Sequence, residues 1–155
     1  MKCKTLFYIL TLWIALNAIF SPLNSWGYIV YAEAPESPTN SEILRNNPIL
    51  AWKLYLYTRL LEEGFEYKDF KKLRKIAYCE SRWRQYNKNG EVLRGTVNRK
   101  DIGLFQISMI YWKDEAEQLN INIFEPNGNI DMAIQIYKNH GTDPWKWSKM
   151  CWQSF

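Results

Sequence analysis

The sequence predicts a mainly α-helical domain of the α+β class with one small β-hairpin, behind an N-terminal export signal or membrane anchor. Three observations support this prediction. Apolar residues recur at helical spacing over most of residues 48–139, Asn89-Gly90 marks a tight turn beside strand-forming residues, and an apolar run opens the chain. The length of 155 residues leaves room for one compact domain after that run.

The first segment, residues 1–34, has the pattern of an export signal. Lys2 and Lys4 precede an apolar run over residues 5–20, and the stretch 32–34 (AEA) has the small-x-small form of a cleavage site. Because the run is long for a signal core and short for a membrane span, a retained anchor through residues 5–20 stays open, as does a buried core helix. We therefore expect the domain to work outside the cytoplasm, in the periplasm, at the cell surface or as a secreted protein.

The composition excludes several classes of enzyme. The chain has 20 Lys+Arg against 16 Asp+Glu, a net charge of +4, and its single histidine is His140. One histidine makes a histidine-based zinc site or a Ser-His-Asp triad hard to build, and the chain has no phosphate-binding G-x-x-x-x-G-K-S/T loop. We expect no cofactor, no metal and no nucleic-acid partner. The small positive charge serves solubility, or draws the domain to anionic polymers such as cell walls.

The cysteines agree with export. Cys3 lies in the first segment, which leaves Cys79 and Cys151, an even number, in the domain. In an oxidising compartment these two are expected to form a disulfide that ties the end of the chain to its middle. Two free buried thiols are the alternative.

The elements that follow are mostly helical. Residues 35–47 are polar and are interpreted as a linker to the domain at 48–155. Residues 48–63 begin with a proline and end before Gly64, which is the pattern of a helix. Residues 67–84 predict a second helix that ends near Gln85.

The remainder predicts a hairpin and more helices. Asn89-Gly90 followed by residues 91–97 indicates a small β-hairpin. Residues 103–119 suggest two short helices, and residues 120–128 a loop. A last helix capped by Asn129 or Asp131 is expected to run to about residue 139 and to stop at Gly141.

Glu80 lies on the apolar stripe of the predicted helix 67–84. The other members of the stripe are Phe70, Leu73, Ile76, Ala77 and Trp83. A carboxyl group that faces an apolar interior is costly to ionise, so its pKa should rise and it can donate a proton near neutral pH. That is the requirement for an acid that protonates a glycosidic oxygen. A Glu80 that is paired with an arginine, or turned outward at the helix end, is the alternative.

Three stretches, in order, resemble the lysozyme-like superfamily. Residues 79–83 (CESRW) resemble its Glu-Ser motif, and residues 103–108 (GLFQIS) resemble the G-L-M/F-Q-I-N motif of its SLT-type lytic transglycosylase branch. Residues 129–137 (NIDMAIQIY) resemble the family's third helix, which carries a tyrosine near the catalytic glutamate. The resemblance covers about residues 67–152.

The resemblance implies a lysozyme-like helical domain that cleaves the β-1,4 bond between N-acetylmuramic acid and N-acetylglucosamine in peptidoglycan. Glu80 would be the general acid and base, and Ser81, as part of the Glu-Ser motif, would lie at the substrate. Gly103 would let the glycan approach the backbone, Gln106 would offer its amide to the sugar or to Glu80, and Tyr137 would hydrogen-bond in the same cleft. The alternatives are a turn for Gly103, a solvated helix position for Gln106 and the core for Tyr137.

Asp101 leaves the type of reaction open. Residues 101–107 (DIGLFQI) also resemble the D-Y-G-I-x-Q-I stretch of animal-type lysozymes, in which the aspartate is the second carboxylate of a hydrolase. Transglycosylases lack that residue and close a 1,6-anhydro ring with a single glutamate. Asp101 as a solvated turn residue is equally open. The chain also has Ser108 where the transglycosylase motif ends in Asn, and it lacks the A-Y-N-A-G segment.

The expected function is therefore a lytic transglycosylase, acting as a monomer on peptidoglycan glycan strands. A lysozyme-type hydrolase that uses Asp101, a non-catalytic wall-binding or scaffold protein, and a tethered piece of a secretion or conjugation apparatus are the alternatives. Aromatic side chains are candidates for stacking on sugar rings, although each fits a core position equally well; they are Trp83, Tyr111, Trp112, Trp145, Trp147 and Trp152. Residues 144–147 are expected in a surface loop.

Overall fold

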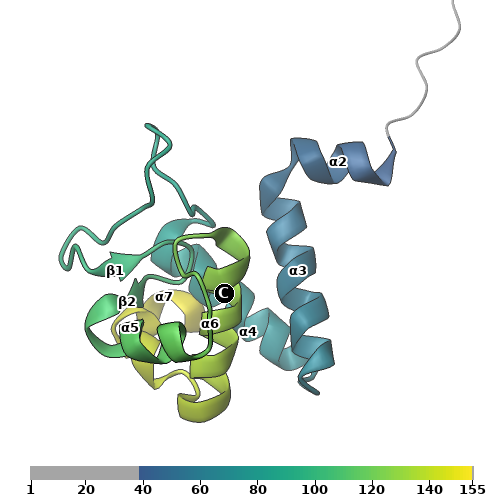
Figure 1. Ribbon diagram of the computed structural model, residues 1–155. Coiled ribbons are helices and arrows are strands. Elements are labelled where there is room, and N and C mark those ends of the chain that lie inside the picture. Colours follow the sequence, from purple (N-terminus) through teal and green to yellow (C-terminus); the bar gives the residue numbers. More distant parts are fainter. Residues whose placement is uncertain (1–38, 155) are drawn as a thin grey trace, which may run out of the picture. The chain divides into compact units, whose positions relative to one another are not determined.

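Helices dominate the computed structural model, which describes residues 39–154 (Figure 1). The predicted signal or anchor, residues 1–34, lies outside the described residues. The elements are α2 (Asn40–Asn46), α3 (Pro48–Glu62), α4 (Tyr67–Ser81), β1 (Asp101–Ile102), β2 (Ile107–Ser108), α5 (Met109–Gln118), α6 (Pro126–His140), the 3₁₀ helix η1 (Asp143–Ser148) and α7 (Lys149–Gln153). The prediction of a mainly α fold with a small antiparallel sheet is confirmed.

The segment interpreted as a linker contains a helix over part of its length. Thr39 caps α2 through a capping box, in which the Thr39 amide donates to Glu42 Oε2 over 2.8 Å and Thr39 Oγ1 accepts from the Glu42 amide. Asn47 then caps α3, as its side chain accepts from the Leu50 amide. Two consecutive N-caps therefore turn a polar stretch into helix starts, which composition alone does not reveal.

Helix α3 agrees with the sequence prediction, whereas α4 ends earlier than expected. The chain leaves α4 through two consecutive left-handed residues, Arg82 (φ 58°) and Trp83 (φ 60°). Ser81 supports this sharp exit, because its hydroxyl accepts from the Arg84 amide over 3.0 Å. Glu80 consequently lies in the last turn of α4, directly before the chain changes direction.

The hairpin prediction is wrong in its position. The two strands β1 and β2 pair antiparallel with Asp101 opposite Ser108 and Ile102 opposite Ile107. A turn does form at Gly90 (φ +80°), but its flanks make only isolated bridges, one between Tyr86 and Val92 and one between Arg94 and Ile102.

The Asn87 side chain shapes this turn. Its Oδ1 accepts from the amides of Asn89 and Glu91, while the Asn87 and Leu93 amides still donate across the turn to the Glu91 and Gln85 carbonyls, each over 2.8 Å.

The next two segments also differ from the prediction. Residues 103–106 form the turn between β1 and β2, and a single helix, α5, replaces the two short helices expected over 103–119. Helix α6 begins at Pro126, so Asn129 lies inside it and caps nothing. Gly141 (φ +60°) ends α6 as predicted, and the expected loop at 144–147 belongs to η1.

The core surrounds α6. In Figure 1, the sheet and α5 lie on one side of α6, and α3 lies on the other. Side chains from each of these elements are buried together, among them Leu56 and Leu60 of α3, Ile102 and Ile107 of the sheet, Ala116 of α5, and Ile130 and Ile134 of α6. The predicted disulfide between Cys79 and Cys151 is confirmed and joins α4 to α7. Within residues 39–154, no helix has both the length and the apolar character that crossing a bilayer requires.

Candidate active site

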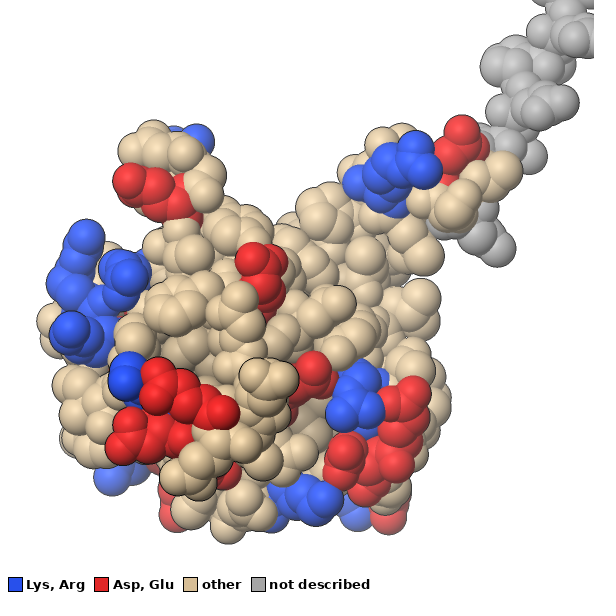
Figure 2. Space-filling view, in the orientation of Figure 1, with Lys and Arg blue, Asp and Glu red and all other residues tan. Residues whose placement is uncertain are grey.

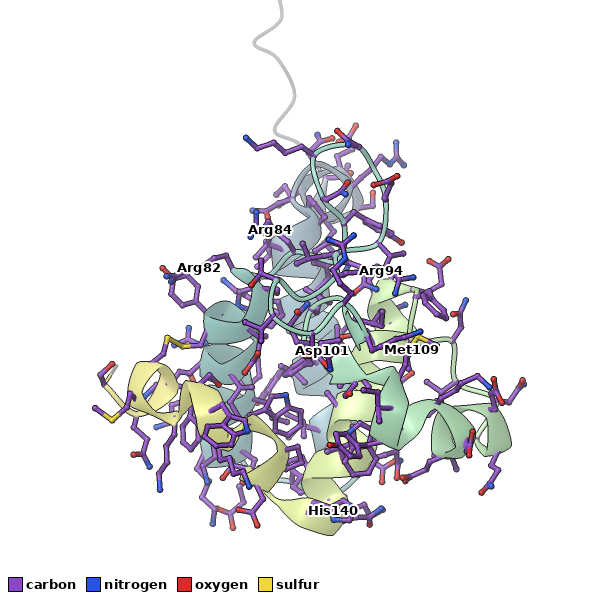
Figure 3. All side chains as sticks on the ribbon, turned by 90° about the vertical axis from the view of Figure 1, so that its left-hand side faces the viewer. Arg82, Arg84, Arg94, Asp101, Met109 and His140 are labelled. Carbon is purple, nitrogen blue, oxygen red and sulfur yellow. A yellow bond between two sulfur atoms is a disulfide. The ribbon has the colours of Figure 1, made fainter. Side chains whose placement is uncertain are left out.

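A cleft of about 840 Å³ opens beside the C-terminal turn of α4. Its lining combines Glu80 of α4, Asp101 of β1, Ser108 of β2, Tyr111 and Trp112 of α5, Ile136 of α6, Trp145, Trp147 and Ser148 of η1, and the loop 95–98. Figure 3 looks onto the face that carries Asp101, with the yellow η1–α7 segment on one side and the green helix α5 on the other. Segments far apart in the chain thus converge around one carboxyl group.

Glu80 is the part-buried acid of this cleft. Its Oε1 accepts a hydrogen bond of 2.5 Å from the hydroxyl of Ser148, 68 residues further along the chain. Burial raises the pKa of the Glu80 carboxyl; the Ser148 hydrogen bond opposes the rise, and the negative charge of Asp101 adds to it. The net direction is upward, as the position of Glu80 on an apolar stripe predicts. The side chain therefore holds its proton to higher pH than a solvated glutamate.

Asp101 lies in the same cleft in a more polar setting. Its Oδ1 accepts from Asn98 Nδ2 over 2.8 Å, and it faces Ser108 across the two-stranded sheet. Burial raises the pKa of the Asp101 carboxyl, and its polar neighbours oppose that rise. The Ser108 hydroxyl is buried but lies outside good hydrogen-bonding geometry with any partner in residues 39–154. The sheet register thus places the Asp101 carboxyl group beside a residue whose hydroxyl is buried behind the cleft surface.

Aromatic side chains form two kinds of wall. Trp145 is 4% exposed and is held from below, because its indole donates to the Phe105 carbonyl over 2.9 Å. Tyr111 and Trp147 are 75% and 89% exposed, so their rings stand free at the rim. A cleft lined by one buried ring, that of Trp145, and two exposed rings, those of Tyr111 and Trp147, suits an extended ligand built of rings.

Two of the proposed aromatic residues do not line the cleft. Trp83 is buried, with the Lys53 ammonium 5.5 Å from the centre of its ring. Trp152 is buried against Trp145, whose carbonyl accepts from the Trp152 indole over 3.1 Å. The sequence alone does not distinguish these two core residues from the aromatic residues that line the cleft, whereas the structure does.

Ser81 and Gly103 are also absent from the cleft lining. Ser81 is buried, and its hydroxyl donates to the Leu104 carbonyl over 2.8 Å. Gly103 has φ +69°, and a Cβ built on it would lie 2.2 Å from Oε1 of Gln85. The expected close approach at Gly103 therefore exists, but it is made by a buried glutamine and not by a ligand.

Tyr137 and Gln106 have different positions. The expectation that Tyr137 hydrogen-bonds in the cleft is wrong, because its hydroxyl donates to Asp69 Oδ1 over 2.7 Å in the interior; burial and this bond raise the pKa of Tyr137. Gln106 does line the cleft, with a left-handed backbone (φ 49°) and an amide that donates to the Gly103 carbonyl over 2.8 Å.

Ser148 and Asn98 are site residues that the sequence analysis missed. No local pattern marks Ser148, but the cysteines contain an indirect signal. A bridge between Cys79 and Cys151 brings the residue after Cys79, which is Glu80, close to the residues just before Cys151. In residues 39–154, no group of three or more His, Cys, Asp or Glu side chains is arranged to hold a metal ion.

Figure 2 shows a face of the molecule that lies at right angles to the view of Figure 3. On the face drawn in Figure 2, acidic and basic side chains alternate in small groups around a broad uncharged area. No protein-family model, no characterised protein and no solved structure matches the chain. The cleft and the residues within it are therefore the features of the molecule that point to a function.

Proposed function

We propose that this protein cleaves the β-1,4 bond between N-acetylmuramic acid and N-acetylglucosamine in peptidoglycan, with Glu80 as general acid and base. One observation carries the proposal: Glu80 is a part-buried carboxyl group with a raised pKa at the wall of an open cleft of about 840 Å³. A glycosidic oxygen is a poor leaving group until it is protonated, so an acid that keeps its proton near neutral pH is the first requirement of glycoside cleavage.

The cleft also suits a polysaccharide. Flat rings such as those of Tyr111 and Trp147 stack on the apolar faces of pyranose rings and bury a large area for little loss of conformational freedom. Both rings are exposed, so neither needs to leave a packed position to bind. Two polar side chains that line the same cleft, Asp101 and Gln106, supply the directional contacts that sugar hydroxyls need.

A lytic transglycosylase is the first form of this proposal. Protonated Glu80 gives its proton to the bridging oxygen, and the bond from that oxygen to C1 of the muramic acid breaks. The C6 hydroxyl of the same sugar then attacks C1, and its proton passes to the Glu80 carboxylate, which restores the acid. The products are a free glycan end and a 1,6-anhydro end, and no water is consumed.

A lysozyme-type hydrolase is the second form, and the position of Asp101 favours it. Asp101 lies in the same cleft as Glu80, and its charge affects the Glu80 carboxyl. Asp101 would stabilise the positive charge at C1, or form a bond to it, until water completes the reaction. The product then has a reducing end, which contains one water more than the anhydro end.

We place the reaction outside the cytoplasm, with the protein acting as a monomer on wall glycan. The Cys79–Cys151 disulfide supports this location, because disulfides persist in oxidising compartments. We expect recognition to depend on the aromatic and polar side chains that line the cleft.

The test is Glu80→Gln in the full chain, measured by the loss of turbidity of purified cell walls. We expect cleavage to be abolished while co-sedimentation with walls is retained, because Gln keeps the shape of the side chain and lacks the proton. Glu117→Gln is the matched control, since Glu117 is an exposed glutamate that pairs with Lys113 on α5. If Glu80→Gln clears walls as fast as the parent, Glu80 is not the acid.

Two further results distinguish the remaining possibilities. If the parent binds walls without clearing them, the protein is a wall-binding or scaffold protein. Mass analysis of released muropeptides separates the two reaction types by the one water that an anhydro end lacks.

A further inference from the structure

The Glu80 carboxyl group is held by one side chain. Within residues 39–154, its hydrogen-bond partner is the hydroxyl of Ser148, at 2.5 Å. The same hydroxyl lies 3.1 Å from the carbonyl oxygen of Trp145. The Ser148 hydroxyl therefore lies between the Glu80 carboxyl group, which can gain or lose a proton, and the Trp145 carbonyl, which only accepts hydrogen bonds.

Three contacts fix the position of Ser148. It is the last residue of η1, and three residues later Cys151 is bonded to Cys79, the neighbour of Glu80. The Trp145 indole anchors the start of the same turn to the Phe105 carbonyl. The Trp152 indole donates to the Trp145 carbonyl from the following helix. The segment that carries the Ser148 hydroxyl is thus held in place by hydrogen bonds before Ser148 and by the disulfide after it.

The single hydroxyl proton can serve both states of the acid. When Glu80 is ionised, Ser148 donates its proton to the carboxylate. When Glu80 is protonated, the carboxyl group donates to Ser148 Oγ, and Ser148 turns its own proton to the Trp145 carbonyl. That carbonyl keeps the bond from Trp152 in either case, so neither state leaves a buried polar group without a partner.

We propose that Ser148 is a positioning residue that holds the Glu80 carboxyl in one orientation through both halves of the reaction, first as the hydrogen-bond acceptor of the protonated acid and then as the donor to the ionised carboxylate. This inference rests on the proposed function of Glu80 and adds a second residue to it. An alanine at position 148 can serve neither state, whereas a threonine can serve both.

The other charged or titratable groups that share the cleft with Glu80 come from three elements. They are Asp101 of β1, Tyr111 of α5, and Asp143 and Lys146 of η1. None of these is changed by a substitution at Ser148. A change in the titration of Glu80 in such a variant is therefore attributable to the lost hydroxyl.

The decisive measurement is the titration of Glu80 by carbon-13 NMR of the side-chain carboxyl groups in the full chain, with Glu80→Gln to assign the signal. Because the Ser148 hydroxyl bonds the ionised carboxylate more strongly than the neutral carboxyl group, Ser148→Ala should raise the midpoint by about one pH unit. Ser148→Thr should stay near the parent. Ser154→Ala is the control, because that hydroxyl bonds only the Cys151 carbonyl at the exposed end of the chain.

An unshifted Glu80 midpoint in folded Ser148→Ala would overturn the proposal. If that variant does not fold, Ser148→Val against Ser148→Thr gives the same comparison, because the two side chains have the same shape and differ in the hydroxyl.

Activity supplies an independent readout. In Ser148→Ala, the alkaline limb of kcat against pH should move upward with the Glu80 midpoint, with KM little changed. An equal loss of kcat at all pH values would show a merely structural role and would contradict the proposal. If the parent protein cleaves no wall, the proposed function fails, and the NMR titration still decides the role of Ser148.

Discussion

Removal of the disulfide should cost this protein a large part of its stability. Cys79 and Cys151 are 72 residues apart, so the bridge closes a long loop of the unfolded chain. The loop-closure entropy for that length amounts to about 4 kcal/mol at 25 °C. A domain of this size has a free energy of unfolding of roughly 6–17 kcal/mol. The bridge therefore contributes between about a quarter and two thirds of the total.

The assay is urea denaturation followed by tryptophan fluorescence, comparing the parent with the double variant Cys79→Ala and Cys151→Ala. Both proteins carry Cys3→Ala, so that no new pairing forms. We expect the double variant to remain folded at low urea and to lose about 4 kcal/mol of unfolding free energy. Since the bridge also holds η1 and α7 against α4, the variant should lose wall-clearing activity before it loses helix content.

A small effect of the disulfide on the free energy of unfolding would contradict this expectation. A difference in unfolding free energy below about 1 kcal/mol would mean that the bridge barely restricts the unfolded chain, contrary to the loop-closure argument. Reduction of the parent with a thiol reagent is the matched test, because it breaks the same bond without altering the side chains. Agreement between the reduced parent and the double variant would exclude an effect of the alanines themselves.

Three further predictions concern the cleft. Asp101→Asn removes a charge that helps to raise the pKa of Glu80, so the alkaline limb of kcat against pH should move to lower pH; an unmoved limb would show that Asp101 does not act on Glu80. Trp147→Ala removes an exposed ring and should raise KM for soluble glycan fragments about ten-fold, with kcat little changed; a fall in kcat alone would argue against a stacking role. Glu80→Gln should be more stable than the parent at pH 8, because the raised pKa of Glu80 makes its ionisation destabilising to the folded state; the advantage should vanish below the unfolded carboxyl pKa of about 4.3, and equal urea midpoints at pH 8 would contradict the burial of Glu80.

The sequence predicts the helices best where an apolar stripe and a stop signal agree. Helix α3 begins at its proline and ends two residues before Gly64, and α6 stops at Gly141. The same periodicity places Glu80 on the buried side of α4, and the cysteine count predicts the bridge. The helix ends and the position of Glu80 are set by local sequence. The bridge is predictable because Cys79 and Cys151 are the only cysteines in the domain at 48–155.

The errors arise where a polar side chain bonds to nearby backbone. The hairpin expected at 89–97 forms only isolated bridges, and within its turn the Asn87 side chain accepts from the amides of Asn89 and Glu91. The linker expected at 35–47 becomes helical at 40–46 because Thr39 and Glu42 form a capping box. Whether a short polar side chain points at its own backbone or at solvent is decided by a few rotamers, and composition cannot resolve that choice.

The site was predictable only in part for a related reason. Glu80 and Asp101 lie in the cleft, whereas Tyr137 and Ser81 do not, although all four belong to the stretches on which the resemblance rests. A motif records which residues occur together and leaves open whether a side chain faces the ligand or supports the backbone. Ser148 shows the opposite case, since it contacts Glu80 and belongs to no motif.

The turn formed by residues 103–106 supports the cleft and contributes only Gln106 to its lining. Two fully buried amides hold its backbone: Gln85 accepts from the Leu104 amide over 2.9 Å, and Asn129 accepts from Phe105 and donates to Ile102, each over 2.9 Å. Because each amide bonds both to the turn and to the carbonyl of Ile123, a shift of the turn would break several buried hydrogen bonds at once. The turn thereby fixes the register that places Asp101 opposite Ser108, so the glycine at position 103 serves the cleft by admitting Gln85.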